Sequence, residues 1–128
     1  MKLLLDTHVL LWFQADDPAL PGPIRTAIRS AANESFVSMV SLWEIGVKHG
    51  IGKLPLRMPL DAFFSTITDA PFRILGLERE HIVTASALPL DHRDLFDRML
   101  IGQALQEGMS VVTVDQQFGK YTVPMIGL

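Results

Sequence analysis

The sequence predicts an α/β layer fold in which a short, mainly parallel sheet is flanked by helices. Short apolar runs of strand length alternate along the chain with segments in which apolar residues recur at helical spacing. Such alternation indicates parallel strands, because each helical crossover covers one face of the sheet. A chain of 128 residues with 48% hydrophobic side chains supplies one core of ordinary size, so we expect a single domain over residues 1–128.

In the first half of the chain, the apolar runs end at polar or helix-breaking residues. The run from Lys2 to Leu5 ends at Asp6, and the apolar group after it ends before two proline-containing turns. Pro23 suits the first position of a helix, where a backbone N–H has no intrahelical partner. The elements expected here are a strand at 2–5, a helix at 8–13, a helix at 23–32, a strand at 35–38 and a helix at 40–49.

In the second half, glycine and proline again separate the periodic segments. Pro89 stops one helix, and Gly108 suits the left-handed end of another. The run from Ser110 to Val114 is the clearest strand pattern in the chain, and it ends at Asp115. The elements expected here are a helix at 60–70, a strand at 72–75, a helix at 78–88, a polar loop at 91–96, a helix at 97–107, a strand at 110–114 and a last strand near 123–126.

Composition excludes several classes of function. The 11 Lys and Arg residues against 14 Asp and Glu residues give a net charge of −3, so any contact with nucleic acid must be local. The absence of cysteine excludes disulfides and zinc–thiolate sites and suits a reducing compartment, so we expect a cytoplasmic location. No apolar run approaches the roughly 18 residues of a membrane span, and Asp6 interrupts the N-terminal run before it resembles an export signal.

Two acids directly follow predicted strands. Asp6 comes after the first strand and Asp115 after the strand at 110–114. Ligands of open parallel sheets collect beyond the carboxyl ends of the strands, so these two carboxylates are expected to share one crevice. An Asp in such a position is equally an ordinary N-cap, which accepts hydrogen bonds from the first turn of the next helix.

Further acids lie on or before predicted helices. Glu44 is predicted on a helix, where it matches either a capping box with Ser41 or an i,i+4 ion pair with Lys48 on an exposed face. Asp94 and Asp97 match the cap and the first-turn acid of the helix that follows them. If Asp6, Glu44, Asp97 and Asp115 instead meet in one pocket, they suit a hard divalent cation such as magnesium or manganese, since otherwise they would repel one another.

Four stretches of the chain carry a family resemblance. They are Leu3-Leu4-Leu5-Asp6-Thr7-His8-Val9-Leu10-Leu11-Trp12, the span from Val37-Ser38 through Trp43-Glu44-Ile45 to Gly52-Lys53-Leu54, the span from His92-Arg93-Asp94 to Gly102-Gln103-Ala104, and Val112-Thr113-Val114-Asp115-Gln116-Gln117-Phe118. In this order and over nearly its whole length, the chain resembles PIN-domain ribonucleases, in particular VapC-type toxins. The resemblance implies a PIN-like three-layer fold and a site formed by Asp6, Glu44, Asp97 and Asp115. Leu95 stands where relatives often have proline. The role of Asp94 is therefore open between a ligand, a supporting residue and a cap.

The resemblance also implies a reaction, which is metal-assisted hydrolysis of RNA phosphodiester bonds. Asp6 and Asp97 are then expected to bind magnesium or manganese directly, with Asp115 contributing to the same or a second metal directly or through water. Glu44 is expected to orient the attacking water or to act as its base.

Basic groups are needed beside such a site, because its acids repel phosphate. Lys48 and Arg98 are the expected substrate-binding residues, and the alternative for each is a solvated surface charge. Further local candidates are Lys53, Arg57 and Arg93. The four histidines, His8, His49, His81 and His92, do not have the spacing of a zincin-type zinc site, and the two tryptophans are expected to pack in a core or an interface.

The expected partners are an RNA substrate and a small VapB-like antitoxin whose C-terminal segment fills the active-site groove, with a homodimer or a toxin–antitoxin hetero-oligomer as the assembly. One alternative is another magnesium-dependent phosphate hydrolase or a DNase. The other is a non-catalytic protein-binding module whose acids are helix caps.

Overall fold

One sheet of five parallel strands, in the order β3-β2-β1-β4-β5, forms the centre of the computed structural model, which describes residues 1–69, 71–89, 94–121 and 124–126. The prediction of a parallel sheet is confirmed. The first strand in the chain is the central strand of the sheet, with β2 and β4 as its neighbours. The strands are β1 (Lys2–Leu5), β2 (Glu34–Ser38), β3 (Phe72–Leu75), β4 (Ser110–Val112) and β5 (Met125–Ile126).

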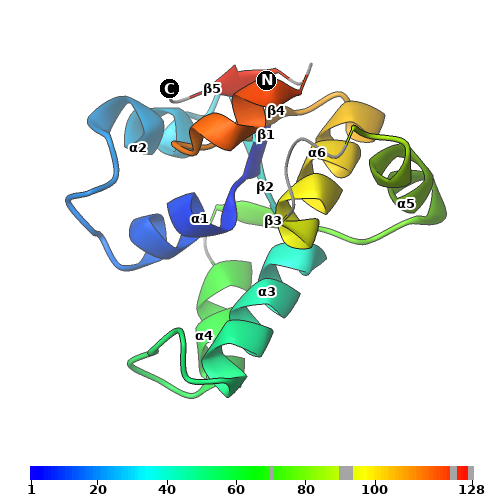
Figure 1. The fold of residues 1–128 in the computed structure, drawn as a ribbon. Helices are drawn as coiled ribbons and strands as arrows, with labels where there is room; N and C mark the ends of the chain where they lie inside the picture. Colours follow the sequence, from blue (N-terminus) through cyan, green and yellow to red (C-terminus); the bar gives the residue numbers. More distant parts are fainter. Residues whose placement is uncertain (70, 90–93, 122–123, 127–128) are drawn as a thin grey trace.

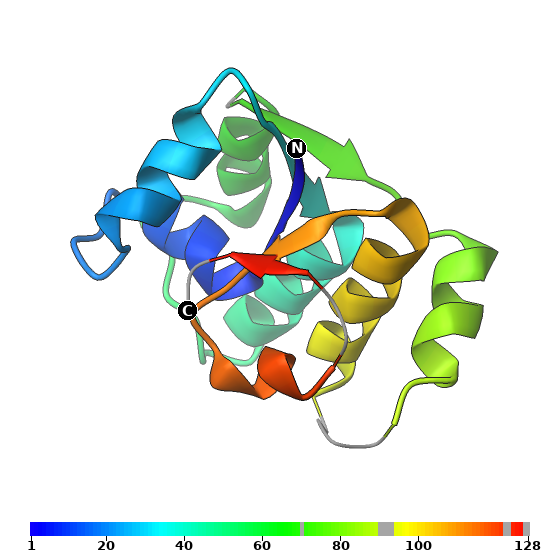
Figure 2. The same ribbon diagram turned by 90° about the horizontal axis from the view of Figure 1, so that it is seen from above.

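Helices cover both faces of this sheet, as predicted for a three-layer fold. Figure 2 shows α1, α2 and α4 on one side of the strands and α5 and α6 on the other, while Figure 1 shows α3 extending away from the end of the sheet. No helix among the described residues is long and apolar enough to span a bilayer. The helices are α1 (Thr7–Gln14), α2 (Gly22–Arg29), α3 (Met39–Gly50), α4 (Leu60–Thr68), α5 (Arg79–Ser86), α6 (Leu95–Glu107) and the 3-10 helix η1 (Gln116–Lys120).

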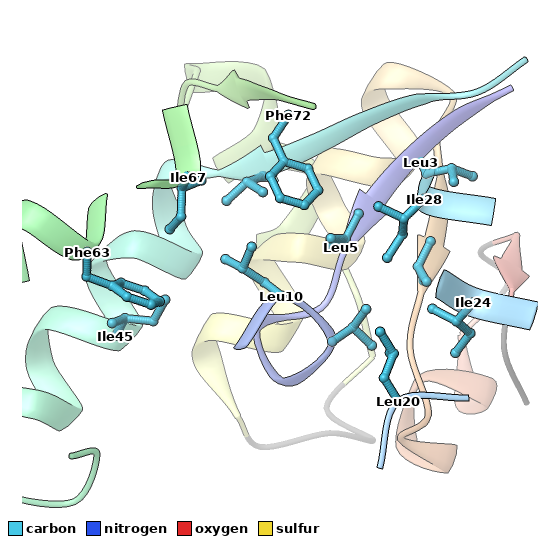
Figure 3. Packing of buried hydrophobic residues seen from close by; sticks show 13 residues of the cluster. Leu3, Leu5, Leu10, Leu20, Ile24, Ile28, Ile45, Phe63, Ile67 and Phe72 are labelled. Atoms are coloured by element: carbon cyan, nitrogen blue, oxygen red, sulfur yellow. The ribbon is translucent and has the colours of Figure 1, made fainter. Parts of the chain in front are cut away.

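Alternation along the central strand divides the core in two. Leu3 and Leu5 point into a cluster formed with α1, α2, α3 and α4, and this cluster is drawn in Figure 3. Leu4 points to the other face, where it packs with residues of α6 such as Leu100 and Ile101. Successive side chains of a strand point to opposite faces, so three leucines in a row supply both halves of the core.

The boundaries differ from the prediction at several points, and the largest difference at a helix end is in α2, which ends at Arg29 rather than near residue 32. Helix α6 begins at Leu95 rather than residue 97, because Asp94 caps it. Strand β4 ends at Val112 rather than residue 114, and β5 pairs with only its last two residues. The 3-10 helix after Asp115 was not predicted, and residues 122–123 of the predicted last strand lie outside the described residues.

Candidate active site

Asp6 lies at the carboxyl end of the central strand, where its backbone N–H donates to the Val112 carbonyl at 2.9 Å. Its side chain does not cap α1, so the N-cap interpretation is wrong for this residue. Instead, the Thr113 hydroxyl donates to Asp6 Oδ2 at 2.9 Å, and the carboxylate is only 3% exposed. Burial raises the pKa of Asp6, against the lowering effect of the Thr113 hydrogen bond and of His8, and Glu44 and Asp115 raise it further.

Asp97 lies in the first turn of α6 and is 8% exposed. Burial raises its pKa to about 8, and the carboxylates of Asp6, Asp94, Glu44 and Asp115 contribute to the same shift. Asp94 itself is the N-cap, since its Oδ1 accepts a hydrogen bond from the Asp97 N–H at 3.1 Å. The cap interpretation therefore holds for Asp94, while Asp97 belongs to a group of like charges.

Glu44 projects from α3 and is 3% exposed. The Thr7 hydroxyl donates to Glu44 Oε1 at 2.7 Å, and Lys48 one turn along α3 donates to Oε2. The capping-box interpretation is wrong, because the N-cap of α3 is Ser38 and Ser41 lies inside the helix. The predicted ion pair with Lys48 is present, but it holds a buried glutamate rather than an exposed one. The contact with Glu44 raises the pKa of Lys48.

Asp115 follows β4 and has two contacts that fix its position. Its Oδ1 accepts a hydrogen bond from the Gln117 N–H at 2.9 Å, so it caps η1, in agreement with the N-cap alternative for this residue. Its own N–H donates to the Thr113 hydroxyl at 2.9 Å. Because its charge also raises the pKa values of Asp6 and Asp97, this cap belongs to the same acidic group.

The four predicted acids thus come together from four elements. Figure 1 shows β1 running into α1 at the end of the sheet where α3 and α6 begin. As the side chains stand, no three His, Cys, Asp or Glu residues in the described ranges form a group that could hold a metal ion. The donors are all carboxylate oxygens, which suit hard cations, and magnesium commonly takes only one or two protein carboxylates. The donor set therefore fits such an ion, with its remaining positions taken by water or substrate.

Of the two cations predicted to bind substrate, only Lys48 lies at the acidic group. Arg98 is 8% exposed, and its guanidinium donates to three backbone carbonyls, those of Ala85 at 3.1 Å, Leu88 at 3.2 Å and Pro89 at 2.7 Å. A guanidinium held by these carbonyls is not presented to phosphate. The prediction that Arg98 contacts the substrate is therefore corrected, because this residue joins α6 to the end of α5.

Sequence reasoning missed two hydroxyl residues at the site, Thr7 and Thr113. Both side chains donate to acids of the group, and both are buried. Their signal was available in the sequence, because Thr7 directly follows Asp6 and Thr113 lies two residues before Asp115. A hydroxyl beside a buried carboxylate fixes the direction of its lone pairs.

A separate apolar hollow of about 400 Å³ lies between α3, α5 and α6. Trp43, which was expected to pack in a core or an interface, is 66% exposed there, and its ring packs edge-on against Phe96 at 5.3 Å between centroids. Leu95 in the same hollow is 77% exposed. His92 and Arg93 lie outside the described residues.

Comparison with known proteins gives one family. The model of the PIN domain family matches residues 3–123. Ribonuclease VapC22 of Mycobacterium tuberculosis is 27% identical over 123 residues, which cover 95% of this chain and 93% of the relative. VapBC2 from Rickettsia felis, solved bound to a DNA fragment of its promoter, superposes with a TM-score of 0.71 at 13% identity, covering 98% of this chain and 97% of that one. A toxin–antitoxin complex from Klebsiella pneumoniae superposes with a TM-score of 0.64 at 12% identity, covering 98% and 96%.

Proposed function

The chain belongs to the PIN-domain family, and we propose that it is a metal-dependent endoribonuclease, the toxin of a toxin–antitoxin pair. The observation that carries this proposal is the buried acidic group, in which the Thr113 hydroxyl contacts both Asp6 and the Asp115 backbone and Asp97 is buried among these carboxylates. Burial together with the neighbouring carboxylates raises the proton affinity of Asp6 and Asp97, and a divalent cation would stabilise such a site. The ribonuclease from Mycobacterium tuberculosis, similar along nearly the full length, supports RNA as the substrate over DNA or a small phosphate ester.

Magnesium or manganese would be held directly by Asp6 and Asp97, with Asp115 contributing directly or through water. When bound, such an ion supplies an activated water and stabilises negative charge on the phosphate oxygens. Asp97 must release its proton to act as a ligand, so metal binding is expected to strengthen as the pH rises through about 8. Thr113 would hold Asp6 in its liganding direction, because it donates to Oδ2.

Glu44 is suited to orient the attacking water or to take its proton. Its two oxygens are already fixed, Oε1 by Thr7 and Oε2 by Lys48, so the side chain has one defined position. Lys48 is about one-third exposed and has two further ammonium protons beyond the one given to Glu44. We assign to it the contact with a phosphate oxygen of the substrate.

A protein partner is the second part of the proposal. The toxin–antitoxin complex from Klebsiella pneumoniae supports an antitoxin, which we expect to be a small VapB-like protein that occupies the active-site groove. The exposed Trp43 and Leu95 at the hollow between α3, α5 and α6 support a protein interface there, in a homodimer or a toxin–antitoxin hetero-oligomer. We expect this assembly in the cytoplasm. A module whose acids are only caps is not supported, because the Asp6 side chain caps no helix.

Cleavage of labelled RNA by the purified protein tests the proposal. Cleavage should require magnesium or manganese, stop with a chelator, and fall at least about a hundredfold in Asp6→Asn, a loss of about 2.7 kcal/mol in transition-state stabilisation. Asp61→Asn on α4 is a matched control, because it removes an exposed acid outside the group. Equal cleavage by wild type and Asp6→Asn, or cleavage that persists in the chelator, would contradict the assignment.

A further inference from the structure

A groove leads away from the acidic site along α1. Its first part, a hollow of about 280 Å³, is lined by Glu44 and Lys48. Its second part, a hollow of about 540 Å³, reaches Arg57 and Met58. Residues shared by both linings make the two hollows continuous, and these are His8, Leu11 and Leu54. We call this continuous surface the α1 groove.

Basic side chains flank the α1 groove. Lys53 lines its first part and Arg57 its second, and both are exposed. Within the part of the chain that the structure describes, neither forms an ion pair. Two acids line the groove: Glu44 in the first part is paired with Lys48, and Asp17 in the second part accepts a hydrogen bond from the Ala19 N–H at 2.8 Å. In a chain of net charge −3, Lys53 and Arg57 thus give the groove two local positive charges beyond the Lys48–Glu44 pair.

The lining of the groove between these cations is apolar and partly aromatic. Trp12 is partly buried and packs against the core below it, and the His8 ring lies 6.3 Å from the Trp12 ring, between centroids. Leu54 and Leu56, which are also partly buried, continue this apolar surface. Apolar and aromatic surface bordered by cations is the arrangement on which single-stranded nucleic acids stack their bases and neutralise their phosphates.

We infer that the α1 groove holds the single-stranded RNA flanking the scissile phosphate, with Lys53 and Arg57 on its phosphates and a base against Trp12. The inference rests on the proposed ribonuclease function and adds the direction in which the substrate leaves the acidic site. The cations favour RNA over an apolar peptide, because a peptide would leave the two positive charges without partners. The other cation considered for the substrate, Arg98, is held by carbonyls at the end of α5. The exposed cations Lys53 and Arg57 both line the α1 groove, which agrees with RNA extending along α1.

Binding of a labelled oligouridylate, measured by fluorescence anisotropy over a range of salt concentrations, tests the inference. The background is Asp6→Asn with magnesium present, so that RNA is not consumed. Lys53→Ala and Arg57→Ala should each weaken binding and reduce the salt dependence of log K by about 0.7, the value for one lost phosphate contact on a single strand. Lys53→Arg and Arg57→Lys should restore most of the affinity, whereas Arg79→Ala, an exposed cation on α5, should change neither quantity.

A second measurement places the RNA on the groove. The chain has two tryptophans, so in Trp43→Phe the remaining indole is Trp12, and the oligouridylate should quench its fluorescence. Wild-type cleavage with unchanged affinity and salt slope in Lys53→Ala and Arg57→Ala would overturn this inference while leaving the ribonuclease function intact. If these variants keep RNA affinity but lose the antitoxin, the groove belongs to the antitoxin and the inference is equally wrong. A wild type that neither binds nor cleaves RNA would overturn both proposals.

Discussion

The acidic site and the α5–α6 pair bury charge in opposite ways. In the α5–α6 pair each buried polar group has a partner within the protein. Arg98 donates to three carbonyls at the end of α5, and His81, which is fully buried, accepts from the Glu78 N–H at 3.0 Å and donates to Glu107 Oε2 at 2.9 Å. A cation at the end of a helix also meets the negative end of its dipole.

At the acidic site, carboxylates are buried beside other carboxylates. Hydroxyls of Thr7 and Thr113 satisfy single oxygens of Glu44 and Asp6, but burial, together with the like charges nearby, raises the pKa of Asp97 to about 8. The compensation there must come from protons or from a bound cation. The difference shows which buried charges hold the fold together and which are prepared for a ligand.

Asp97→Asn should give the largest effect on cleavage and the clearest break in this comparison. We expect RNA cleavage to fall at least about a hundredfold, because a direct metal ligand is lost. Without metal, the same variant should be more stable than wild type at pH 9, because it removes an ionised carboxylate from a group of like charges. Thermal unfolding in a chelating buffer measures this, and lower stability of the variant at pH 9 would contradict the account of the site.

The pH dependence of wild-type stability follows from the same group. The pKa of Asp97 is about 8 in the folded protein against 3.8 ordinarily, so between these values the folded state holds more protons than the unfolded state. Stability of the metal-free protein should therefore fall as the pH rises through this window, and the raised pKa of Asp6 acts in the same direction. Asp97→Asn should flatten the curve, and magnesium should restore stability at its alkaline end.

Arg98→Ala should destabilise the protein by about 1–3 kcal/mol, because buried carbonyls at the end of α5 lose their donor. This loss of stability should persist at every pH at which the protein folds and in the presence of metal, unlike the effect of Asp97→Asn on stability. Denaturant unfolding measures it, and Arg98→Lys should recover only part of the loss, because one ammonium cannot reproduce the planar guanidinium fork. Full stability with reduced RNA affinity would instead favour the substrate contact that the structure argues against.

Thr113→Val should have the smallest effect, a loss of about tenfold in manganese affinity measured by calorimetry, because Asp6 loses the donor that directs one of its oxygens. Valine has nearly the shape of threonine, so the packing around the fully buried side chain is preserved. Thr84→Val, an exposed hydroxyl on α5, is the control. Unchanged affinity in Thr113→Val would show that the hydrogen bond does not position Asp6.

Much of the fold could be read from local pattern. Strands β1, β2 and β3 were predicted within one residue of their observed bounds, because short apolar runs between turn residues have few alternatives in a chain of this size. The 3-10 helix at 116–120 was missed, since a single short turn of this kind has no apolar periodicity to detect.

The site was predictable in composition but not in detail. Asp6 has the local sequence of an N-cap, and what decides its role is a hydroxyl 107 residues away in the chain. Arg98 is adjacent to the acidic Asp97, yet successive helix residues point about 100° apart, so the two side chains serve different parts of the molecule. Local sequence pattern thus identifies the candidate site residues. Their hydrogen-bond partners depend on which strands lie side by side in the folded sheet.

The order of the strands has a consequence for synthesis. Asp6 is translated well before its neighbour β4 and the acid that follows that strand. A nascent polypeptide therefore carries the first carboxylate through the synthesis of α1 to α6 without the strand that completes the pocket. The nuclease activity we propose therefore requires that β4 and Asp115 have been translated and have paired with the central strand.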